Sequence, residues 1–463
     1  MTDTDIAILG AGPAGLAAAY RLARAGRAVA VLERGTVPGG LAGSFDVGGV
    51  RVDHGSHRLH PSCAPPVMRL LRELMGDELQ RRRRHGRIRL AGRWVAFPPR
   101  PADLARNLPP RFALGLARDT LFAPFRRSPR RDTFAEVVRA SLGPTLAEGF
   151  YAPYVRKIWG VDGAELSGEL ARRRVGARSS GALLRRLRRR TPDAGYFYYP
   201  ARGYGAIVEC LAAAAVGAGA TLELGAEVTG LALEHDRVRV ERAGRPAVAA
   251  EHVWSTLPLP LVARLVEPPA PAPVLAAAGR LAFRSLLLVY LVLDRARYTE
   301  FDAHYFPGLD VAFSRVSEPK NYRDGRGYDP RERTVLCAEI PCSVGDELWR
   351  AGDDELGALV AGGLVSQGLP AAVPVEVAVR RVPRAYPSYT VGYEADFHLV
   401  DGWASAQPHL LSFGRQGLFA HDNTHHAMAM GWAAADALGT GLTVDRDRWA
   451  ASRREFASHV VED

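Results

Sequence analysis

Three glycines near the start of the chain have the spacing of a phosphate-binding turn. Gly10, Gly12 and Gly15 follow the apolar run at residues 5–9 and precede the Ala-rich run at 16–25. The first glycine permits a tight turn, the second lets the backbone approach a diphosphate, and the third lets a helix pack closely on a strand. The start of such a helix presents unpaired N–H groups to an anion. The spacing therefore predicts a dinucleotide-binding strand–turn–helix unit.

Glu33 supplies the acidic residue that such a unit requires. It ends the apolar run 28–32, where we expect the second strand, and it is placed to accept hydrogen bonds from an adenosine ribose. A glycine-rich loop containing Gly39 and Gly40 follows. This loop resembles the continuation found in flavoproteins related to glutathione reductase, which implies FAD rather than NAD. The FAD contacts expected from this unit are Gly10, Gly12, Pro13, Ala14, Gly15, Glu33, Arg34, Gly40, Leu41 and Ala42.

Three later segments resemble the same flavoprotein group in their order and separation. Residues 224–230 resemble a strand that contacts adenine, 255–258 resemble a strand end near the adenosine, and 414–426 resemble the C-terminal FAD motif. Asn423 is a good N-cap for a helix that begins at Thr424. The free N–H groups of that helical turn would face the flavin and stabilise negative charge on it. The additional FAD contacts implied are Val228, Thr256, Gly414, Arg415, Asn423 and Thr424.

Nearly the whole chain resembles the superfamily of amine oxidases, protoporphyrinogen oxidases, phytoene desaturases and UDP-galactopyranose mutases. Within it, residues 52–57 look like the segment that passes over the flavin ring, and the resemblance implies that His57 contacts FAD. Further segments that match these families are 151–160, 165–167, 199–204 and 313–322.

The same resemblance implies residues that contact and act on the substrate. In the mutases, arginines hold a substrate diphosphate, and a bidentate guanidinium suits phosphate oxygens. A neutral histidine close to the flavin could accept a proton during hydride or proton transfer. The implied substrate contacts are Tyr154, Trp159, Arg173, Arg174, Tyr204 and Arg315, and the implied catalytic residues are His54, His57, Arg315 and His425.

Most of these residues also have a purely structural interpretation. Aromatic residues commonly only pack, and Arg315 could form a structural salt bridge instead of binding an anion. His54, His57 and His60 have a spacing that would place metal ligands on one helix face, but this glycine-containing segment is expected to be extended. We therefore predict no metal site there.

The elements that must position these residues indicate an α/β fold. We expect a Rossmann-like FAD-binding domain in discontinuous pieces, with an inserted α+β substrate-binding domain that carries a helical cap. The expected pieces are 1–62, 200–270 and 400–445 for the FAD-binding domain, and 63–199 and 271–399 for the substrate-binding domain.

The expected secondary structure changes character along the chain. Residues 63–200 are basic and Pro-punctuated and are predicted to be helical, and a helix after Asn423 is predicted as the last element. Residues 334–383 are expected to add strands and one helix. Predicted strands elsewhere are 222–230, 237–242, 251–257 and 283–293.

Composition limits the classes of partner. The 463 residues are 47% hydrophobic and 24% charged, as in an ordinary globular protein, and the net charge is +10. The excess positive charge comes mostly from arginines spread along the chain. The arginine runs 81–84 and 185–190 are predicted to be solvated loop or helix faces. We therefore expect no nucleic-acid binding. Residues 103–131 could lie on a membrane surface, but a cap over the substrate is favoured. The four cysteines and the lack of a signal peptide indicate the cytoplasm, and a homodimer stays open.

We therefore predict a FAD-dependent oxidoreductase of the oxidase or desaturase type. It would transfer hydride from a C–N or C–C bond of a small molecule to flavin N5, and the positive net charge is compatible with an anionic substrate. A non-redox mutase of a nucleotide sugar is the alternative enzyme class, and a flavin-carrying binding protein without turnover is the third.

Overall fold

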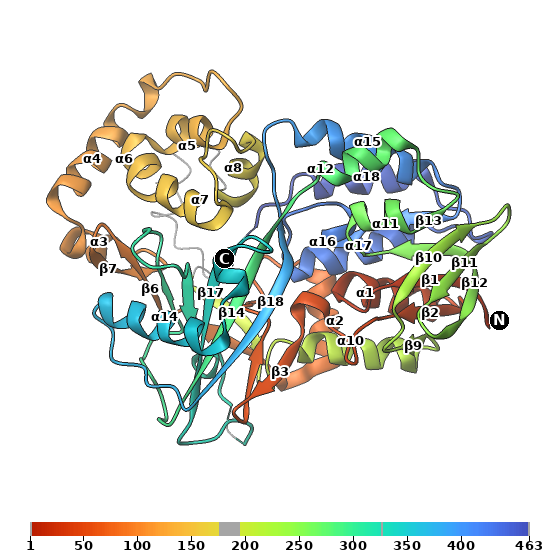
Figure 1. Ribbon diagram of the computed structural model, residues 1–463, viewed down its shortest axis with the longest axis horizontal. Helices are drawn as coiled ribbons and strands as arrows, with labels where there is room; N and C mark the ends of the chain where they lie inside the picture. Colours follow the sequence, from red (N-terminus) through yellow and green to blue (C-terminus); the bar gives the residue numbers. More distant parts are fainter. Residues whose placement is uncertain (1, 176–194, 326, 462–463) are drawn as a thin grey trace.

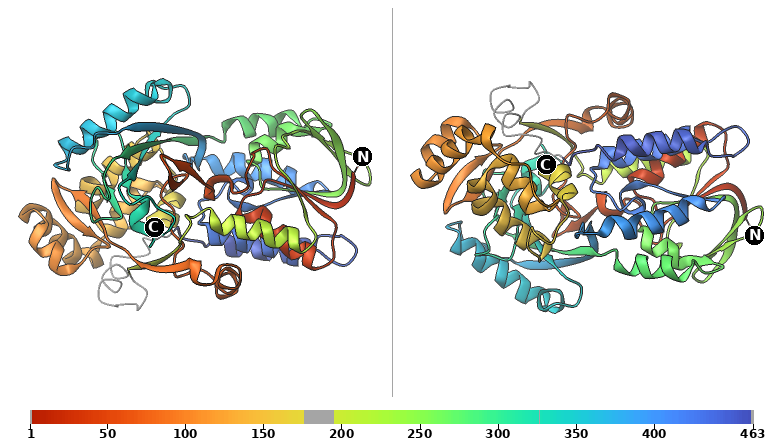
Figure 2. Two further views of the ribbon diagram at one scale, coloured as in Figure 1. Left: turned by 90° about the horizontal axis from the view of Figure 1, so that it is seen from below. Right: turned by 90° about the horizontal axis from the view of Figure 1, so that it is seen from above.

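The computed structural model describes residues 2–175, 195–325 and 327–461, so the arginine run at 185–190 lies outside the described residues. Two large sheets, two two-stranded sheets and a group of helices make up this part of the chain (Figure 1). The two sheet units lie side by side along the long axis in both further views (Figure 2). The predicted α/β fold class is confirmed.

The first sheet assembles strands from widely separated parts of the chain. Its order is β13-β10-β11-β12-β1-β2-β9, and β19 also pairs with β12. The core strand β1 is continuous and apolar, and its residues Ile6 to Leu9 are fully buried because both faces are covered. The strands are β1 (Thr2–Leu9), β2 (Val29–Leu32), β9 (Thr221–Glu223), β10 (Val228–Leu233), β11 (Val238–Arg242), β12 (Arg245–Ser255), β13 (Val266–Glu267) and β19 (Leu410–Ser412).

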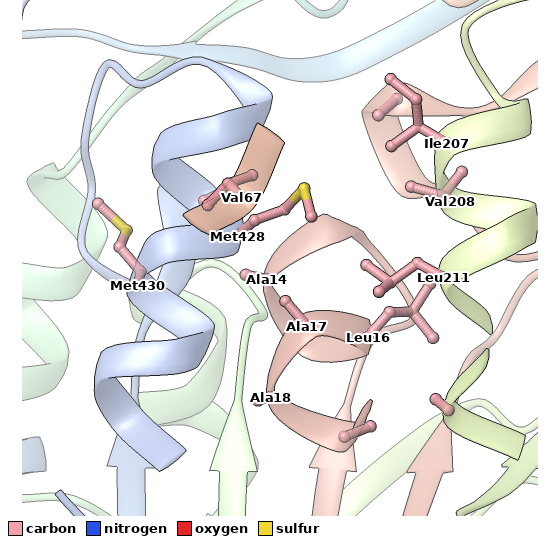
Figure 3. Close-up of a cluster of buried hydrophobic side chains, with 14 of the residues drawn as sticks. Ala14, Leu16, Ala17, Ala18, Val67, Ile207, Val208, Leu211, Met428 and Met430 are labelled. Atoms are coloured by element: carbon pink, nitrogen blue, oxygen red, sulfur yellow. The ribbon is translucent and has the colours of Figure 1, made fainter. Parts of the chain in front are cut away.

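Four helices cover one face of this sheet. They are α1 (Pro13–Arg24), α2 (Pro65–Met75), α10 (Ala206–Gly217) and α17 (Thr424–Asp436). Their apolar side chains meet around α1, as Figure 3 shows for Leu16, Leu211 and Met428. The approach of α17 to α1 needs a glycine, because a Cβ on Gly431 would lie 2.3 Å from the carbonyl oxygen of Ala14. Helices α11 (Leu259–Leu265), α12 (Ala272–Arg280) and α15 (Tyr393–Ala406) contribute to the core on the other side.

The second sheet has the order β18-β14-β17-β16-β15-β6-β7. Helix α14 (Asp353–Ser366) packs on one face, and the hairpin of β3 (Ser44–Val47) and β4 (Val50–Asp53) packs on the other. The predicted strand 283–293 is β14. The strands are β6 (Gly86–Leu90), β7 (Arg93–Phe97), β14 (Phe283–Leu293), β15 (Ala303–Tyr305), β16 (Arg315–Ser317), β17 (Thr334–Cys342) and β18 (Glu376–Pro387).

The prediction that residues 63–200 are helical is wrong for two segments. Besides β6 and β7, the segment contains β5 (Leu79–Arg83), which pairs with β8 (Tyr196–Pro200). The arginine run at 81–84 is therefore mostly strand rather than loop or helix, and Arg84 is only 6% exposed. Its partner strand comes from a distant part of the sequence, so local pattern did not reveal it.

Helices between residues 101 and 175 form a cap above the second sheet (Figure 1). They are α3 (Pro101–Asn107), α4 (Pro110–Leu121), α5 (Phe134–Leu142), α6 (Pro144–Leu146), α7 (Ala152–Trp159) and α8 (Gly168–Val175). The chain continues beyond the predicted last helix, through α18 (Arg446–Phe456), which corrects that prediction. Among the described residues, no helix is both long and apolar enough to cross a membrane.

Domain bounds stay a prediction. Helix α2 shares a hydrophobic core with α1, α10 and α17 of the first sheet unit. The sequence had placed this helix in the substrate-binding domain. A short strand pair, β5 with β8, links it to the segment before α10.

Candidate active site

The glycine turn between β1 and α1 is closed toward the protein and open on one side. Gly10 has a positive φ of 101°, and a Cβ built on it would lie 2.5 Å from Thr256 Oγ1. A Cβ on Gly15 would lie 2.1 Å from the carbonyl oxygen of Gly10. A Cβ on Gly12 would meet nothing within 4 Å. The open space in front of Gly12 and the N-terminus of α1 at Pro13 fit a diphosphate.

Glu33 lies at the end of β2, and its carboxylate faces this turn. Its Oε2 accepts a hydrogen bond from the N–H of Ala11 at 2.9 Å, and its Oε1 accepts one from the N–H of Gly35 at 2.8 Å. The carbonyl oxygen of Glu33 accepts from the N–H of Ala226 at 2.8 Å, two residues before Val228. The acid and β10 are thereby held beside the turn, where an adenosine would need them. The Arg34 side chain is exposed.

The second glycine loop lies directly on the first turn. The N–H of Gly39 donates to the carbonyl oxygen of Ala11 at 2.9 Å, and a Cβ on Gly40 would lie 3.7 Å from the Cα of Gly12. His54 Nδ1 lies 3.2 Å from the carbonyl oxygen of Gly40. The two glycine loops and His54 therefore form one continuous surface, to which Leu41 and the buried Ala42 belong.

The N-terminus of α17 closes another side of this region. Asn423 caps the helix in a capping box with His426, as its type predicted. Gly414, which begins α16 (Gly414–Gly417), packs so closely on α1 that a Cβ on it would lie 2.9 Å from Ala14 Cβ. Two helix N-termini, those of α1 and α17, thus converge on the residues predicted to hold FAD, and the donor set suits an anionic cofactor.

His57 lies in the non-helical segment after β4, between the two sheets. Its ring stacks on that of Tyr204 with centroids 5.1 Å apart, and Tyr204 is hydrogen-bonded to Thr424. His57 Nδ1 lies 3.2 Å from the carbonyl oxygen of Gly55. Burial lowers the pKa of His57 and also that of His54, so both imidazoles are neutral at pH 7.

Asp53 supports this segment and was missed as a site residue. Its Oδ1 accepts from Ser44 Oγ at 2.6 Å and from the N–H of Tyr204 at 3.0 Å, and its Oδ2 accepts from the hydroxyl of Tyr199 at 2.5 Å. The carboxylate thus fixes both the hairpin that precedes His57 and the ring on which His57 stacks. Its position inside the segment 52–57 was the available signal.

Arg315 makes the salt bridge that was its alternative interpretation. Its Nη2 lies 2.8 and 2.9 Å from the two carboxylate oxygens of Glu339, and Nε lies 3.0 Å from Oε1. The N–H of Ser56 donates to the same Glu339 oxygen at 2.8 Å. Arg315 is therefore close to the His57 segment, but a buried acid balances its charge.

A second group of charged residues surrounds Tyr386. The guanidinium of Arg174 lies 5.1 Å from the Tyr386 ring centroid, and that of Arg415 lies 5.5 Å from it. Buried N–H groups of both, Arg174 Nη1 and Arg415 Nε, have no hydrogen-bond partner within the part of the chain that the structure describes. Trp159 packs edge-on against His421, with ring centroids 5.3 Å apart. This group is defined here as the Tyr386 cluster: Arg174, Arg415, Trp159, Tyr386 and His421.

Sequence reasoning missed two members of the Tyr386 cluster. Tyr386 lies near the end of β18 and had no motif to mark it. His421 directly precedes the predicted C-terminal motif residues, which was a usable signal. Burial, and then the charges of Arg174 and Arg415, hold the pKa of His421 well below its usual value. Its Nε2 lies 2.8 Å from the carbonyl oxygen of Pro387, so that nitrogen carries the proton.

Three other predicted residues pack against or pair with near neighbours in the sequence. Tyr154 stacks on Phe150, with ring centroids 5.8 Å apart. Arg173 forms an ion pair with Glu169, with Nε 2.8 Å from Oε1. His425 is buried beside His426, with ring centroids 4.1 Å apart. Their predicted roles stay predictions.

Comparison with known proteins places this arrangement in a family. The family described as "Flavin containing amine oxidoreductase" matches residues 13–442. The fold is similar to that of a reduced UDP-galactopyranose mutase, with a TM-score of 0.81 and 20% identity over 99% of this chain and 100% of that chain. It is also similar to cyclohexylamine oxidase from Brevibacterium oxydans IH-35A, with a TM-score of 0.67 and 19% identity over 94% of this chain and 98% of that chain.

One curated relative matches a short segment. The phytoene dehydrogenase of Streptomyces griseus is 45% identical over 76 residues, which are 16% of this chain and 15% of that protein. The match with the family covers most of the chain, and the turn, the acid and the two helix N-termini fit the cofactor. The predicted superfamily and cofactor are confirmed. The chain belongs to the flavin containing amine oxidoreductase family, and FAD is its cofactor.

Proposed function

We propose that the protein is an oxidoreductase of the oxidase or desaturase type. It would take hydride from a C–N or C–C bond of a small anionic molecule and pass the electrons to oxygen or another acceptor. The observation that carries this proposal is the pair of neutral imidazoles, His54 and His57, beside the loops predicted to hold FAD. When bound, FAD supplies the hydride acceptor at N5.

The contacts of His57 define which nitrogen could accept a proton. A carbonyl oxygen can only accept, so the 3.2 Å contact between Nδ1 and the Gly55 carbonyl assigns the proton to Nδ1. The lone pair is then on Nε2. His54 has the same arrangement, with Nδ1 on the carbonyl of Gly40. A neutral imidazole with a free lone pair suits removal of a proton from the substrate amine or carbon while hydride leaves.

The Tyr386 cluster supplies the reason to propose an anionic substrate. Arg174 and Arg415 bring buried N–H groups without hydrogen-bond partners among the described residues, and the aromatic rings of Trp159 and Tyr386 would exclude water. An anion that enters such a site would accept charge-assisted hydrogen bonds from these guanidinium groups. We therefore assign substrate orientation to Arg174 and Trp159, whereas Arg415 stays a predicted FAD contact beside them.

Anaerobic flavin bleaching tests the proposal. A substrate should bleach the bound flavin without added reductant, and His57→Asn should slow bleaching by about 100-fold or more while FAD content stays unchanged. Arg174→Met should raise KM by about tenfold, whereas Met at the exposed Arg239 should not. If no compound bleaches the flavin and turnover appears only after dithionite reduction, the oxidoreductase proposal fails.

That failure would favour a second candidate, a non-redox isomerase of a nucleotide sugar. The specific observation in its favour is again the Tyr386 cluster, because two arginines beside an aromatic ring suit a diphosphate. Its signature would be a product isomeric with the substrate. In either case we propose a cytoplasmic protein, since all four cysteines are free thiols. A homodimer stays a prediction.

A further inference from the structure

Helix α4 of the cap is packed against the protein on its inner face. A Cβ on Gly115 would lie 2.6 Å from Thr145 Oγ1, so this face needs a glycine to approach α6. The Phe112 ring lies against Gly149, where a Cβ would be 2.7 Å from its Cε2. Asp119 is buried on this side, and its Oδ2 accepts from the N–H of Thr145 at 2.7 Å. These contacts hold α4 in place without using its outer face.

The outer face of α4 carries leucines and arginines in alternation. Four residues have separations of three, four and three, which place them on one side of a helix: Arg111, Leu114, Arg118 and Leu121. Leu114 and Leu121 are each 72% exposed, and both arginines are exposed as well. Solvent rather than protein therefore surrounds the two leucines.

Two phenylalanines extend the apolar surface past the end of α4. Phe122 directly follows the helix and is 55% exposed, and Phe125, in the next helical turn η3 (Ala123–Phe125), is 80% exposed. A single exposed apolar residue is normal on a protein surface, but a group of them marks a surface that binds something. We call Leu114, Leu121, Phe122 and Phe125 the apolar rim.

The segment around the apolar rim is strongly basic. Residues 106–131 contain seven arginines and a single acid, Asp119, which is buried on the inner face of α4. The side chains of Arg111, Arg127 and Arg130 are exposed. Positive charge beside exposed apolar side chains complements a surface that is anionic outside and apolar beneath.

We propose that the apolar rim and its arginines bind the cap to the surface of an anionic membrane. The Leu and Phe side chains would enter the boundary between headgroups and acyl chains, while the long arginine side chains keep their guanidinium groups at the phosphates. In Figures 1 and 2, α4 lies near the end of the long axis that is farther from the first sheet, so a flat surface can reach it. The sequence favoured a cap over a membrane surface for residues 103–131, and the two faces of α4 allow both.

A second copy of the chain fits this face less well. A symmetric pair would bring each basic segment against its own copy, and like charges at an interface oppose association. A stable protein interface also requires roughly 20–30 residues on each side, whereas a membrane can hold a protein through a few inserted side chains and nearby basic residues. The charge and the small number of exposed apolar side chains therefore favour the membrane.

Co-sedimentation of the FAD-loaded protein with vesicles tests the proposal. The protein should bind vesicles that contain phosphatidylglycerol at least about tenfold more tightly than pure phosphatidylcholine vesicles, and rising salt should weaken this binding. Phe122→Ser together with Phe125→Ser should weaken it by about tenfold or more, because two phenylalanine side chains can no longer be buried. Arg111→Gln together with Arg127→Gln should weaken it by about fivefold for each arginine.

Val216→Ser supplies a matched control. Val216 is an exposed valine on α10 of the first sheet unit, so this variant should bind vesicles as the parent does. Anionic vesicles should also slow amide hydrogen exchange at residues 110–125 in the parent but not in the variant with both Phe substitutions. Circular dichroism and flavin absorbance would establish that each variant is folded.

The proposal is overturned if the parent stays in the supernatant with anionic vesicles, or if it binds pure phosphatidylcholine equally well. It is also overturned if the two Phe substitutions leave binding unchanged, or if Val216→Ser weakens it to the same extent. A parent that is a dimer in solution and becomes a monomer with the two Phe substitutions would overturn it too, because the face would then join two copies. Flavin bleaching is measured without vesicles, so this proposal and the proposed function fail separately.

Discussion

His304 is a buried residue whose ring nitrogens both have partners. Nδ1 accepts a hydrogen bond from Arg87 Nε at 3.0 Å, and Nε2 lies 3.0 Å from Thr299 Oγ1. The ring is therefore neutral, with its proton on Nε2. Burial and then the charge of Arg87 lower the pKa of His304 to about 3. A proton added at Nδ1 would face the guanidinium that now donates to it.

This lowered pKa predicts how stability depends on pH. Between the unfolded pKa near 6.5 and the folded pKa near 3, the unfolded chain binds a proton that the folded chain does not, so stability falls as the pH falls. At pH 5 the loss from His304 is about 2 kcal/mol. Urea unfolding at pH 7.5 and pH 5 should therefore show a smaller acid loss in His304→Gln than in the parent. Equal losses would contradict the assignment.

For single residues, the sequence predicted the site residues that lie within motifs. It missed those that lie outside motifs and reach the site only in the folded chain. Gly10, Gly15 and Glu33 were assigned from local spacing. Close packing explains the two glycines, and the hydrogen bonds accepted by its carboxylate explain Glu33. Tyr386 had no motif, because its neighbours Arg174 and Arg415 come from distant segments. Arg315 could have bound an anionic ligand or an acidic side chain. It pairs with Glu339, and no local sequence pattern links these two residues.

Among the elements, the β1–α1 turn allows two glycines to be compared directly. Gly12→Val should abolish most FAD binding yet leave the apoprotein folded, because the new side chain enters open space rather than protein. Gly15→Val should destabilise the fold by about 1–3 kcal/mol or more, because its Cβ would clash with the Gly10 carbonyl. Flavin absorbance and urea unfolding measure the two effects. The interpretation fails if Gly12→Val retains FAD or if both variants unfold alike.

Elements with strong local patterns were predicted well. The strand 283–293 is rich in Leu and Val, and it became β14 with the same bounds. By contrast, β5 contains three arginines and pairs with the distant β8, and it was predicted as helix. β6 was predicted as helix too, although it pairs with the adjacent β7 as well as with the distant β15. Helix α18 was missed because its sequence is mostly polar, and Trp449 and Phe456 are its two buried residues. Tertiary pairing outweighed local propensity in the strands.

For the whole molecule, order along the chain was enough to predict an α/β architecture with a first sheet built from separated segments. β1, β12 and β19 are parallel neighbours although they come from different thirds of the chain. The glycine turn and the C-terminal motif must lie side by side if both contact one cofactor, and this requirement predicted that the N-terminal and C-terminal segments share a sheet. The packing of the two large sheets against each other could not be predicted from sequence patterns. It depends on buried contacts between distant segments, such as the one between Arg58 and Asp302.

Arg58 and Asp302 connect the segment after β4 with the loop before β15. Arg58 Nη2 lies 3.1 Å from Asp302 Oδ1, and their side chains are 7% and 3% exposed. Asp302 Oδ2 also accepts from the N–H of His85 at 2.9 Å. Arg58 donates to the hydroxyl of Tyr305 as well, at 2.8 Å. The pair thus joins segments from three parts of the chain at the junction between the sheets.

Removing only the cation should cost more than removing both charges. Arg58→Met leaves the Asp302 carboxylate buried without its countercharge, so urea unfolding should show a loss of about 3–5 kcal/mol. Adding Asp302→Asn should recover much of that loss, because the amide oxygen can still accept from the N–H of His85 and no buried charge remains. If the double variant were as unstable as Arg58→Met, packing of the long Arg58 side chain rather than charge would hold the two sheet units together.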